Sequence, residues 1–115
     1  MSISRRTFSR ALGGTAALGS FFPAALRAQT LDQVKIYYGF PPGSAGDSVA
    51  RRVGEKLAGS GYTKNAGVVE NRAGAGGRIA LESLKAAPAD GSVLALSPFS
   101  CTSIYPHIYN KLSYD

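Results

Sequence analysis

The sequence predicts an α/β fold in which strands and helices alternate to build a parallel sheet. Three short segments with the composition of strands lie at residues 34–38, 67–70 and 92–97. Two segments with the apolar spacing of helices separate them, one starting at Asp47 and one at Arg78. Strands that alternate with helices pair in parallel through right-handed crossovers, so this order predicts a βαβαβ unit.

The first strand and the first helix follow directly from residue patterns. Residues 34–38 read Val-Lys-Ile-Tyr-Tyr and end at Gly39, which is typical of a strand. Asp47 is expected to cap the following helix, and Gly59 and Gly61 to end it. Four apolar residues at helical spacing are expected to face the sheet: Val49, Ala50, Val53 and Leu57.

The remaining elements repeat the same alternation. Gly67-Val-Val-Glu70 predicts the second strand, and residues 78–86 predict a second helix that Pro88 ends. Asp90-Gly91 predicts a turn. Residues 92–97 are almost continuously apolar, as expected for a strand covered on both faces. The residues of the second helix expected to face the sheet are Ile79, Ala80, Leu84 and Ala87.

The net charge gives no indication of nucleic-acid binding. The chain has 115 residues, 13 of them basic and 7 acidic, for a net charge of +6. Four of the arginines precede residue 29, and the remaining residues carry no basic stripe, so no nucleic-acid partner is expected. The single cysteine, Cys101, allows no disulfide within the chain. The length allows one small domain.

Residues 1–28 predict an export signal. Ser4-Arg-Arg-Thr-Phe8 is followed by a mildly apolar run from Ala11 to Ala25, which is shorter than the roughly 20 residues that span a bilayer. A charged start, a short apolar run and a small residue before the mature chain describe a signal peptide. The paired arginines favour the twin-arginine export machinery, cleavage near Ala28 and a periplasmic location. An uncleaved amphipathic anchor is the alternative.

Two glycine-rich turns are the most informative feature of the chain. Phe40-Pro-Pro-Gly-Ser-Ala-Gly-Asp47 follows the first strand, and Glu70-Asn-Arg-Ala-Gly-Ala-Gly-Gly77 follows the second. A strand, a glycine turn and a helix bring backbone N–H groups and a helix N-terminus together, an arrangement that binds anions. Loops at 40–46, 71–77 and 98–103 all leave the carboxyl ends of the strands, where such sheets bind ligands. The residues expected around this point are Gly43, Ser44, Ala45, Gly76, Gly77, Phe99, Ser100 and Thr102.

Four segments in register resemble one family. The segments Gly39–Arg51, Val68–Gly77, Ala86–Gly91 and Tyr105–Asp115 are similar, in this order, to Bug-type extracytoplasmic solute receptors. These receptors are the substrate-binding components of tripartite tricarboxylate transporters. The resemblance covers nearly all of the chain from Val34 onward. Two departures fall at the pocket: Tyr38-Gly39 stands where the family often has valine-proline, and Ser44 replaces a common glycine.

The resemblance implies a two-lobed Venus flytrap of the type 2 class that closes on a carboxylate. It implies a periplasmic receptor, not an enzyme, that delivers a small organic acid to the membrane permease subunits of a transporter. No cofactor, metal site or catalytic residue is expected. A dicarboxylate, a tricarboxylate, an amino acid and an aromatic acid all fit as ligands. The ligand contacts carried over are Phe40, Ser44, Ala45, Asp47, Ala75, Gly76, Gly77, Ser100 and Thr102, to which the glycine-turn argument adds Gly43.

Family members are much longer, so residues 29–115 are expected to form the N-terminal part of the first lobe, truncated before the second. Two alternatives stand beside the receptor. One is a truncated remnant without function, and the other is a secreted α/β enzyme whose catalytic residues lie in the missing part.

Four further features have competing interpretations. Arg78 either contacts a second carboxylate or faces solvent. Cys101 is expected to be an inert, partly buried thiol and not a nucleophile. The lone His107 is expected to pack structurally and not to bind a metal or act in catalysis. Gly74-Ala-Gly-Gly77 does not complete a dinucleotide fingerprint, because Ile79 stands where the third glycine would be.

Overall fold

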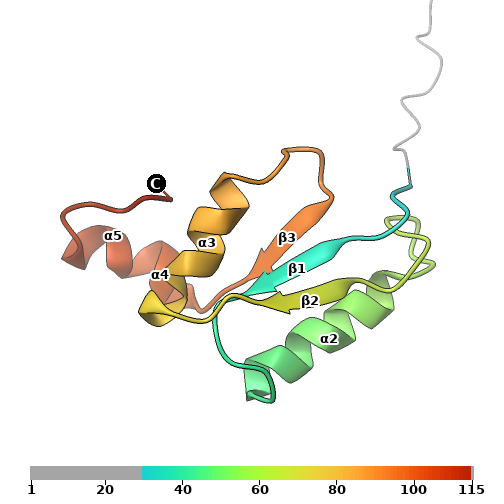
Figure 1. Cartoon of the computed structure of the whole chain (residues 1–115), viewed down its shortest axis with the longest axis horizontal. Helices are drawn as coiled ribbons and strands as arrows, with labels where there is room; N and C mark the ends of the chain where they lie inside the picture. The colour runs from blue at the N-terminus through green and yellow to red at the C-terminus, as the bar shows by residue number, and fades with distance from the viewer. Residues whose placement is uncertain (1–29, 115) are drawn as a thin grey trace, which may run out of the picture.

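The computed structural model describes residues 30–114, and Figure 1 shows how its elements are arranged. The order of strands and long helices confirms the predicted βαβαβ unit. The predicted export signal at residues 1–28 lies outside the described residues. The elements are β1 (Lys35–Tyr38), α2 (Ala45–Leu57), β2 (Val68–Asn71), the 3-10 turn η1 (Ala75–Gly77), α3 (Arg78–Lys85), β3 (Val93–Leu96), α4 (Phe99–Ser103) and α5 (Tyr105–Ile108).

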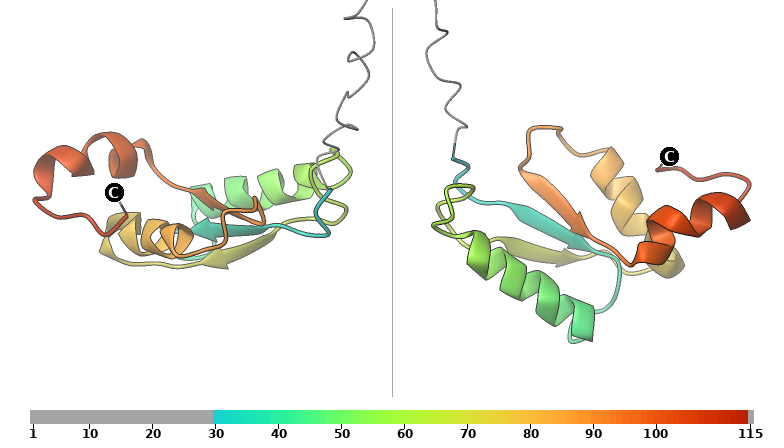
Figure 2. Two further views of the ribbon diagram at one scale, coloured as in Figure 1. Left: turned by 90° about the horizontal axis from the view of Figure 1, so that it is seen from above. Right: turned by 180° about the vertical axis from the view of Figure 1, so that it is seen from behind.

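The three strands form one parallel sheet in the order β2-β1-β3. Ile36 in β1 pairs with Val69 of β2 and Leu94 of β3. The chain steps from β1 to β2 and then back past β1 to β3, so two right-handed crossovers place their helices on opposite faces. Figure 2 shows α2 on one face and α3 on the other, with α4 and α5 beyond the ends to which the strand arrows point.

The core lies between α2 and the sheet. Its buried residues are Val34, Ile36, Tyr38 and Ala50. The helix approaches β2 closely because two glycines face each other: the Gly67 N–H donates to the Gly54 carbonyl at 2.9 Å. A Cβ at Gly54 would lie 2.8 Å from the Gly67 carbonyl oxygen, so no larger residue fits there.

The predicted inward faces of the helices are partly wrong. Val49, Val53 and Ile79 are 51%, 41% and 41% exposed, whereas Ala50 and Ala80 are fully buried. The physical reason is the close approach of α2 to the sheet, which it contacts through two small residues, Ala50 and Gly54. The larger valines are displaced to the side of that contact.

Two predictions about the end of the sheet also need correction. All four residues of β3 are half-buried, not covered on both faces, because α2 packs against β1 and β2 while α3 packs against β1 and β3. The segment expected as a loop at 98–103 is mostly helical. Pro98 has an extended backbone and stands at the N-cap of α4, so the chain turns into a helix directly after β3.

Candidate functional site

The candidate site lies at the carboxyl edge of the sheet, where three connections leave the strands. The strand order places β2 on one side of β1 and β3 on the other, so the point where the connections diverge lies between β1 and β3. Ligands of open α/β sheets bind at this switch point. A hollow of about 220 Å³ lies there, lined by Tyr38, Gly46, Val49, Leu96, Ser97 and Pro98.

Loop 1, residues 39–44, leads from β1 into α2. Gly43 has a φ of +84°, which favours glycine. Ser44 is the N-cap of α2, and its hydroxyl oxygen accepts from the Asp47 N–H at 3.3 Å. Ala45 and Gly46 begin the helix, and the N–H groups of this first turn have no carbonyl partner within it. They are therefore the donors that the junction of loop 1 with α2 offers to an anion.

The expectation that Asp47 caps α2 is wrong, because Ser44 takes that position. Asp47 lies in the first turn and is almost fully buried, at 3% exposure. Its carboxylate accepts from Arg51 Nε and from the Gly43 N–H, both at 3.0 Å, and from Asn71 Nδ2 at 2.8 Å. These hydrogen bonds, that from Arg51 foremost, lower the pKa of Asp47 to about 2. The Asp47 side chain thus holds loop 1 and uses the Gly43 N–H in doing so.

This network predicts an acid-sensitive stability. The folded-state pKa of Asp47 is about 2, below the ordinary value of 3.8, so its contribution is complete above the ordinary value. As the pH falls through the folded value, that contribution is lost. Urea denaturation across this range should show a smaller acid-induced loss of stability for Asp47→Asn than for the wild type. An equal loss in both proteins would contradict the network. Comparing the two proteins isolates the contribution of Asp47. Hydrogen bonds also lower the pKa of three other carboxyls, from Lys64 to Asp32, from Arg72 to Glu70 and from Ser92 to Asp90, but these contribute equally to both proteins.

Loop 2, residues 72–77, leads from β2 into α3. Four consecutive residues have positive φ: Gly74 at 139°, Ala75 at 48°, Gly76 at 66° and Gly77 at 94°. The Gly77 N–H donates to the Gly74 carbonyl at 2.9 Å, which closes η1. The Gly76 carbonyl accepts from the Tyr105 hydroxyl at 3.3 Å, so the loop is tied to α5 through that oxygen. This glycine run is required by the backbone conformation.

The two loops touch through their backbones. A Cβ at Gly39 would lie 2.5 Å from the Gly77 Cα, so only glycine allows this approach. A Cβ at Gly77 would lie 3.2 Å from the Phe40 ring and 3.3 Å from the Cys101 sulfur. Loop 1, loop 2 and α4 therefore meet at one point, as the carboxyl-edge argument predicts.

The other predicted contact residues are distributed around this point. Ser100 and Thr102 lie on α4 on either side of Cys101, and the Thr102 hydroxyl donates to the Phe99 carbonyl at 3.2 Å. Phe99 is 74% exposed. Ala75 is exposed in loop 2.

Three residues with competing interpretations occupy defined places. Arg78 is half-buried: its Nε donates to the Ala75 carbonyl at 3.0 Å, and its guanidinium lies 4.3 Å from the centre of the Tyr109 ring. Cys101 is fully buried, deeper than expected, because it packs under loop 2 with its thiol 3.5 Å from the Gly76 carbonyl oxygen. His107 is exposed on α5, so the expectation that it packs structurally is wrong.

Sequence reasoning missed two residues that hold the loops. Asn71 ends β2 and reaches loop 1, and Tyr105 on α5 reaches loop 2. Asn71 had a signal in the sequence, since an amide side chain directly before a glycine loop is placed at the carboxyl edge. Tyr105 had none, because its position depends on α4 and α5 folding back over loop 2.

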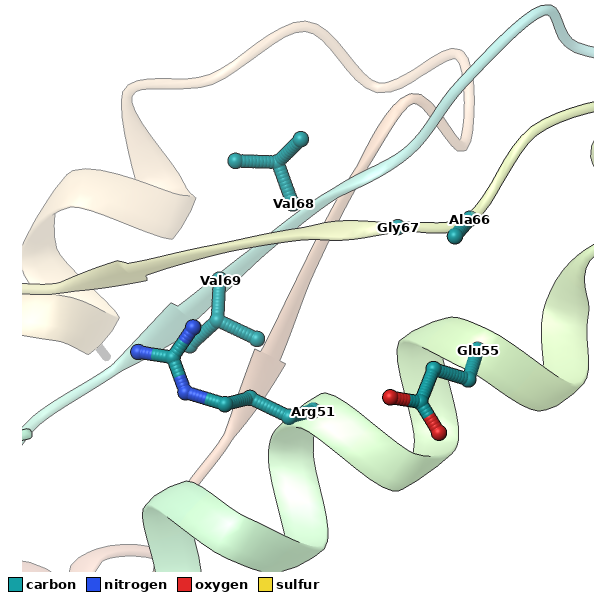
Figure 3. Close-up of a pocket in the computed structure, with 6 residues that line it drawn as sticks. All are labelled: Arg51, Glu55, Ala66, Gly67, Val68 and Val69. Carbon is teal, nitrogen blue, oxygen red and sulfur yellow. The ribbon is translucent and has the colours of Figure 1, made fainter. Parts of the chain in front are cut away.

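A second hollow lies away from the loops. This groove of about 350 Å³ lies between α2 and β2. Figure 3 shows the residues that line it: Arg51, Glu55, Ala66, Gly67, Val68 and Val69. The Arg51 guanidinium is already paired with Asp47, and the Glu55 carboxylate would repel an anion. This groove therefore suits a carboxylate less well than the carboxyl edge does.

Two features are absent from residues 30–114. No helix in this part of the chain is long and apolar enough to cross a membrane. Among the same residues, no three side chains of the metal-binding types gather into a group.

A parallel α/β unit with two glycine loops touching at its carboxyl edge is consistent with a lobe of the periplasmic-receptor class. Comparison with protein families identifies the family: residues 49–115 match the tripartite tricarboxylate transporter family receptor, TctC. This match covers more than half of the chain, which therefore belongs to that family. A comparison with curated proteins finds no match. The chain is thus an extracytoplasmic solute receptor of tripartite transporters, and its family is one of transport receptors, not enzymes.

Proposed function

We propose that this receptor binds a small carboxylate through the backbone N–H groups of loops 1 and 2. The contact of Gly39 with Gly77 carries the proposal, because it brings the two loops together at the carboxyl edge. The first turn of α2 contributes the N–H groups of Ala45 and Gly46 and the positive end of the helix dipole. Each such dipole interaction is worth about 0.3–1 kcal/mol when exposed and more when enclosed.

The other predicted contacts have distinct parts in this proposal. The Phe40 ring and the α4 residues Ser100 and Thr102 would form the walls of the site. Asp47 would act through water or through an ammonium group of the ligand, since its carboxylate would repel another carboxylate. The remaining backbone contacts would come from Ser44, Ala75 and Gly76. The Gly43 N–H already donates to Asp47 and the Gly77 N–H to the Gly74 carbonyl, so these two glycines would shape the loops and not donate to the ligand.

A panel of acids tests this function. The complete gene product is heated with a dicarboxylate, a tricarboxylate, an amino acid and an aromatic acid in turn. A ligand that binds only the folded state stabilises it by about 2.7 kcal/mol at a hundredfold excess over its Kd. A rise in Tm with one or two of the acids is expected and names the ligand class. A protein that melts cooperatively but responds to none of them does not have this function.

We also propose that residues 29–115 form the first part of the first lobe of a two-lobed receptor. The apolar surface beside β3 supports this, since β3 is half-buried and the exposed Val49 lines a hollow together with Leu96 of that strand. Closure of a second lobe would enclose the loops and exclude water. Small-angle scattering of the complete gene product should show a smaller radius of gyration with a bound acid, and an unchanged radius would speak against closure.

Residues 1–28 are proposed to direct the chain to the periplasm by the twin-arginine route, with cleavage near Ala28. The paired arginines Arg5 and Arg6 support this proposal. Replacing both by lysine should leave the uncleaved precursor inside the cell, as fractionation and blotting would show. Undiminished export of that variant would rule out this route. A membrane permease is the partner proposed for the exported receptor.

A further inference from the structure

The side chain of Asn71 has every polar atom engaged at the junction of β2, loop 1 and α2. Its amide nitrogen donates to the Phe40 carbonyl at 3.1 Å and to Asp47 Oδ1 at 2.8 Å. Its amide oxygen accepts from Arg51 Nη2 at 3.4 Å. One side chain of the second strand therefore holds groups from two other elements.

These contacts fix loop 1 at both ends. Asn71 holds the first part of the loop directly, through the Phe40 carbonyl. It holds the last part through Asp47, whose Oδ2 accepts from the Gly43 N–H at 3.0 Å. Pro41 and Pro42 lie between these points and have no N–H to donate. Hydrogen bonds from side chains must therefore hold this part of loop 1 in place of hydrogen bonds within the backbone.

We propose that Asn71 is the positioning residue that sets loop 1 in its binding conformation before ligand arrives. This inference rests on the proposed function, since it names the residue that orients the donors of the same site. When loop 1 is free to move, only a fraction of the molecules has Ser44, Ala45 and Gly46 correctly presented. The apparent affinity then falls to that fraction of its full value.

An amide is required at this position because it must donate twice, to a carbonyl and to a carboxylate. A carboxylate of the same shape has no proton to donate and would repel Asp47. Asn71→Asp therefore preserves the volume of the side chain but replaces its two N–H donors by an oxygen that only accepts. Its effect should weaken at acidic pH, because one of two facing carboxyls takes up a proton readily and regains a donor. Arg51 is the other charged group facing this position.

The test measures loop 1 directly in the ligand-free complete gene product. Hydrogen exchange of the Gly43 amide, followed by NMR, reports its bond to Asp47. Protection of this amide should fall by about tenfold or more in Asn71→Ala and Asn71→Asp. In Asn71→Asp it should recover as the pH is lowered from about 7 to 5. The matched control is Asn65→Ala, which removes an amide that donates to the Asp32 carbonyl far from loop 1. It should leave Gly43 unchanged.

Calorimetric titration with succinate and with citrate forms the second arm. The Kd of whichever acid binds the wild type should rise about tenfold in the Asn71 variants and stay unchanged in Asn65→Ala. Unchanged Gly43 protection in a folded Asn71 variant overturns the proposal, as does lost protection with unchanged affinity. If neither acid binds the wild type, the proposed function fails on that ligand class. The exchange arm then still decides whether Asn71 fixes loop 1.

Discussion

Replacing Gly39 by alanine will lower the stability of the fold and weaken carboxylate binding in one step. The added Cβ would lie 2.5 Å from the Gly77 Cα and 3.0 Å from the Gly77 carbonyl oxygen. Both atoms belong to the backbone, so no side chain can rotate away to make room. Overpacking of this kind costs about 1–3 kcal/mol. Relief requires loops 1 and 2 to move apart, which separates the two sets of N–H donors.

The measurement is urea denaturation combined with titration of an acid that raises the Tm of the wild type. Gly59→Asn is the control, since a Cβ there has nothing within 4 Å and its φ of +70° lies in the left-handed region that asparagine adopts more readily than other L-residues. The control should retain affinity and lose less stability than Gly39→Ala. If Gly39→Ala matches the wild type in both, the close approach of the loops is not a feature of the folded protein.

Replacing Gly76 by valine will abolish most carboxylate binding while leaving the protein folded. Gly76 has a φ of +66°, a conformation that costs an L-residue about 1–2 kcal/mol, and a branched side chain strains it further. Loop 2 would escape the strain by rotating its peptide groups, which turns its N–H donors away. Because Gly76 is exposed, the core keeps its packing. Affinity should fall at least about tenfold. The strain should lower the Tm by several degrees without unfolding the protein.

The matched variant separates backbone strain from a steric clash. A Cβ at Gly76 would lie 2.6 Å from the Tyr105 hydroxyl, which is the far end of a side chain that can move. Adding Tyr105→Phe to Gly76→Val removes that oxygen but leaves the backbone strain. Affinity should therefore stay low in the double variant. Full recovery would show that Tyr105, not the backbone of loop 2, controls the site.

The sequence allowed the order of strands and helices to be predicted because each element has a local signal. The strand Lys35–Tyr38, with its isoleucine and two tyrosines, and the glycine turn that follows it are examples. The face of a helix that packs against the sheet has no such local signal. Val49 and Val53 have the spacing of an inward face, yet the close approach of Gly54 to Gly67 turns Ala50 inward instead.

The candidate site was predictable as a location and less so as a mechanism. The glycines of both loops were identified because positive φ and close approach demand them. The Gly43 N–H, however, serves Asp47 and not a ligand, and the cap of α2 is Ser44. Asp47 and Ser44 are both common caps, and only the geometry of loop 1 distinguishes them. The sequence places Asn71 at the carboxyl edge, but its partners there, Phe40 and Asp47, are far from it in the sequence, and no local pattern predicts those contacts.

The most direct test of the central claim is to follow backbone amides by NMR while an acid from the panel is added. If loops 1 and 2 hold the carboxylate, the amides of Ala45, Gly46 and Gly76 should shift downfield together and saturate at one Kd. Amides in the groove beside β2, such as those of Val68 and Val69, should stay unmoved. Shifts confined to that groove, with loops 1 and 2 unchanged, would contradict the account.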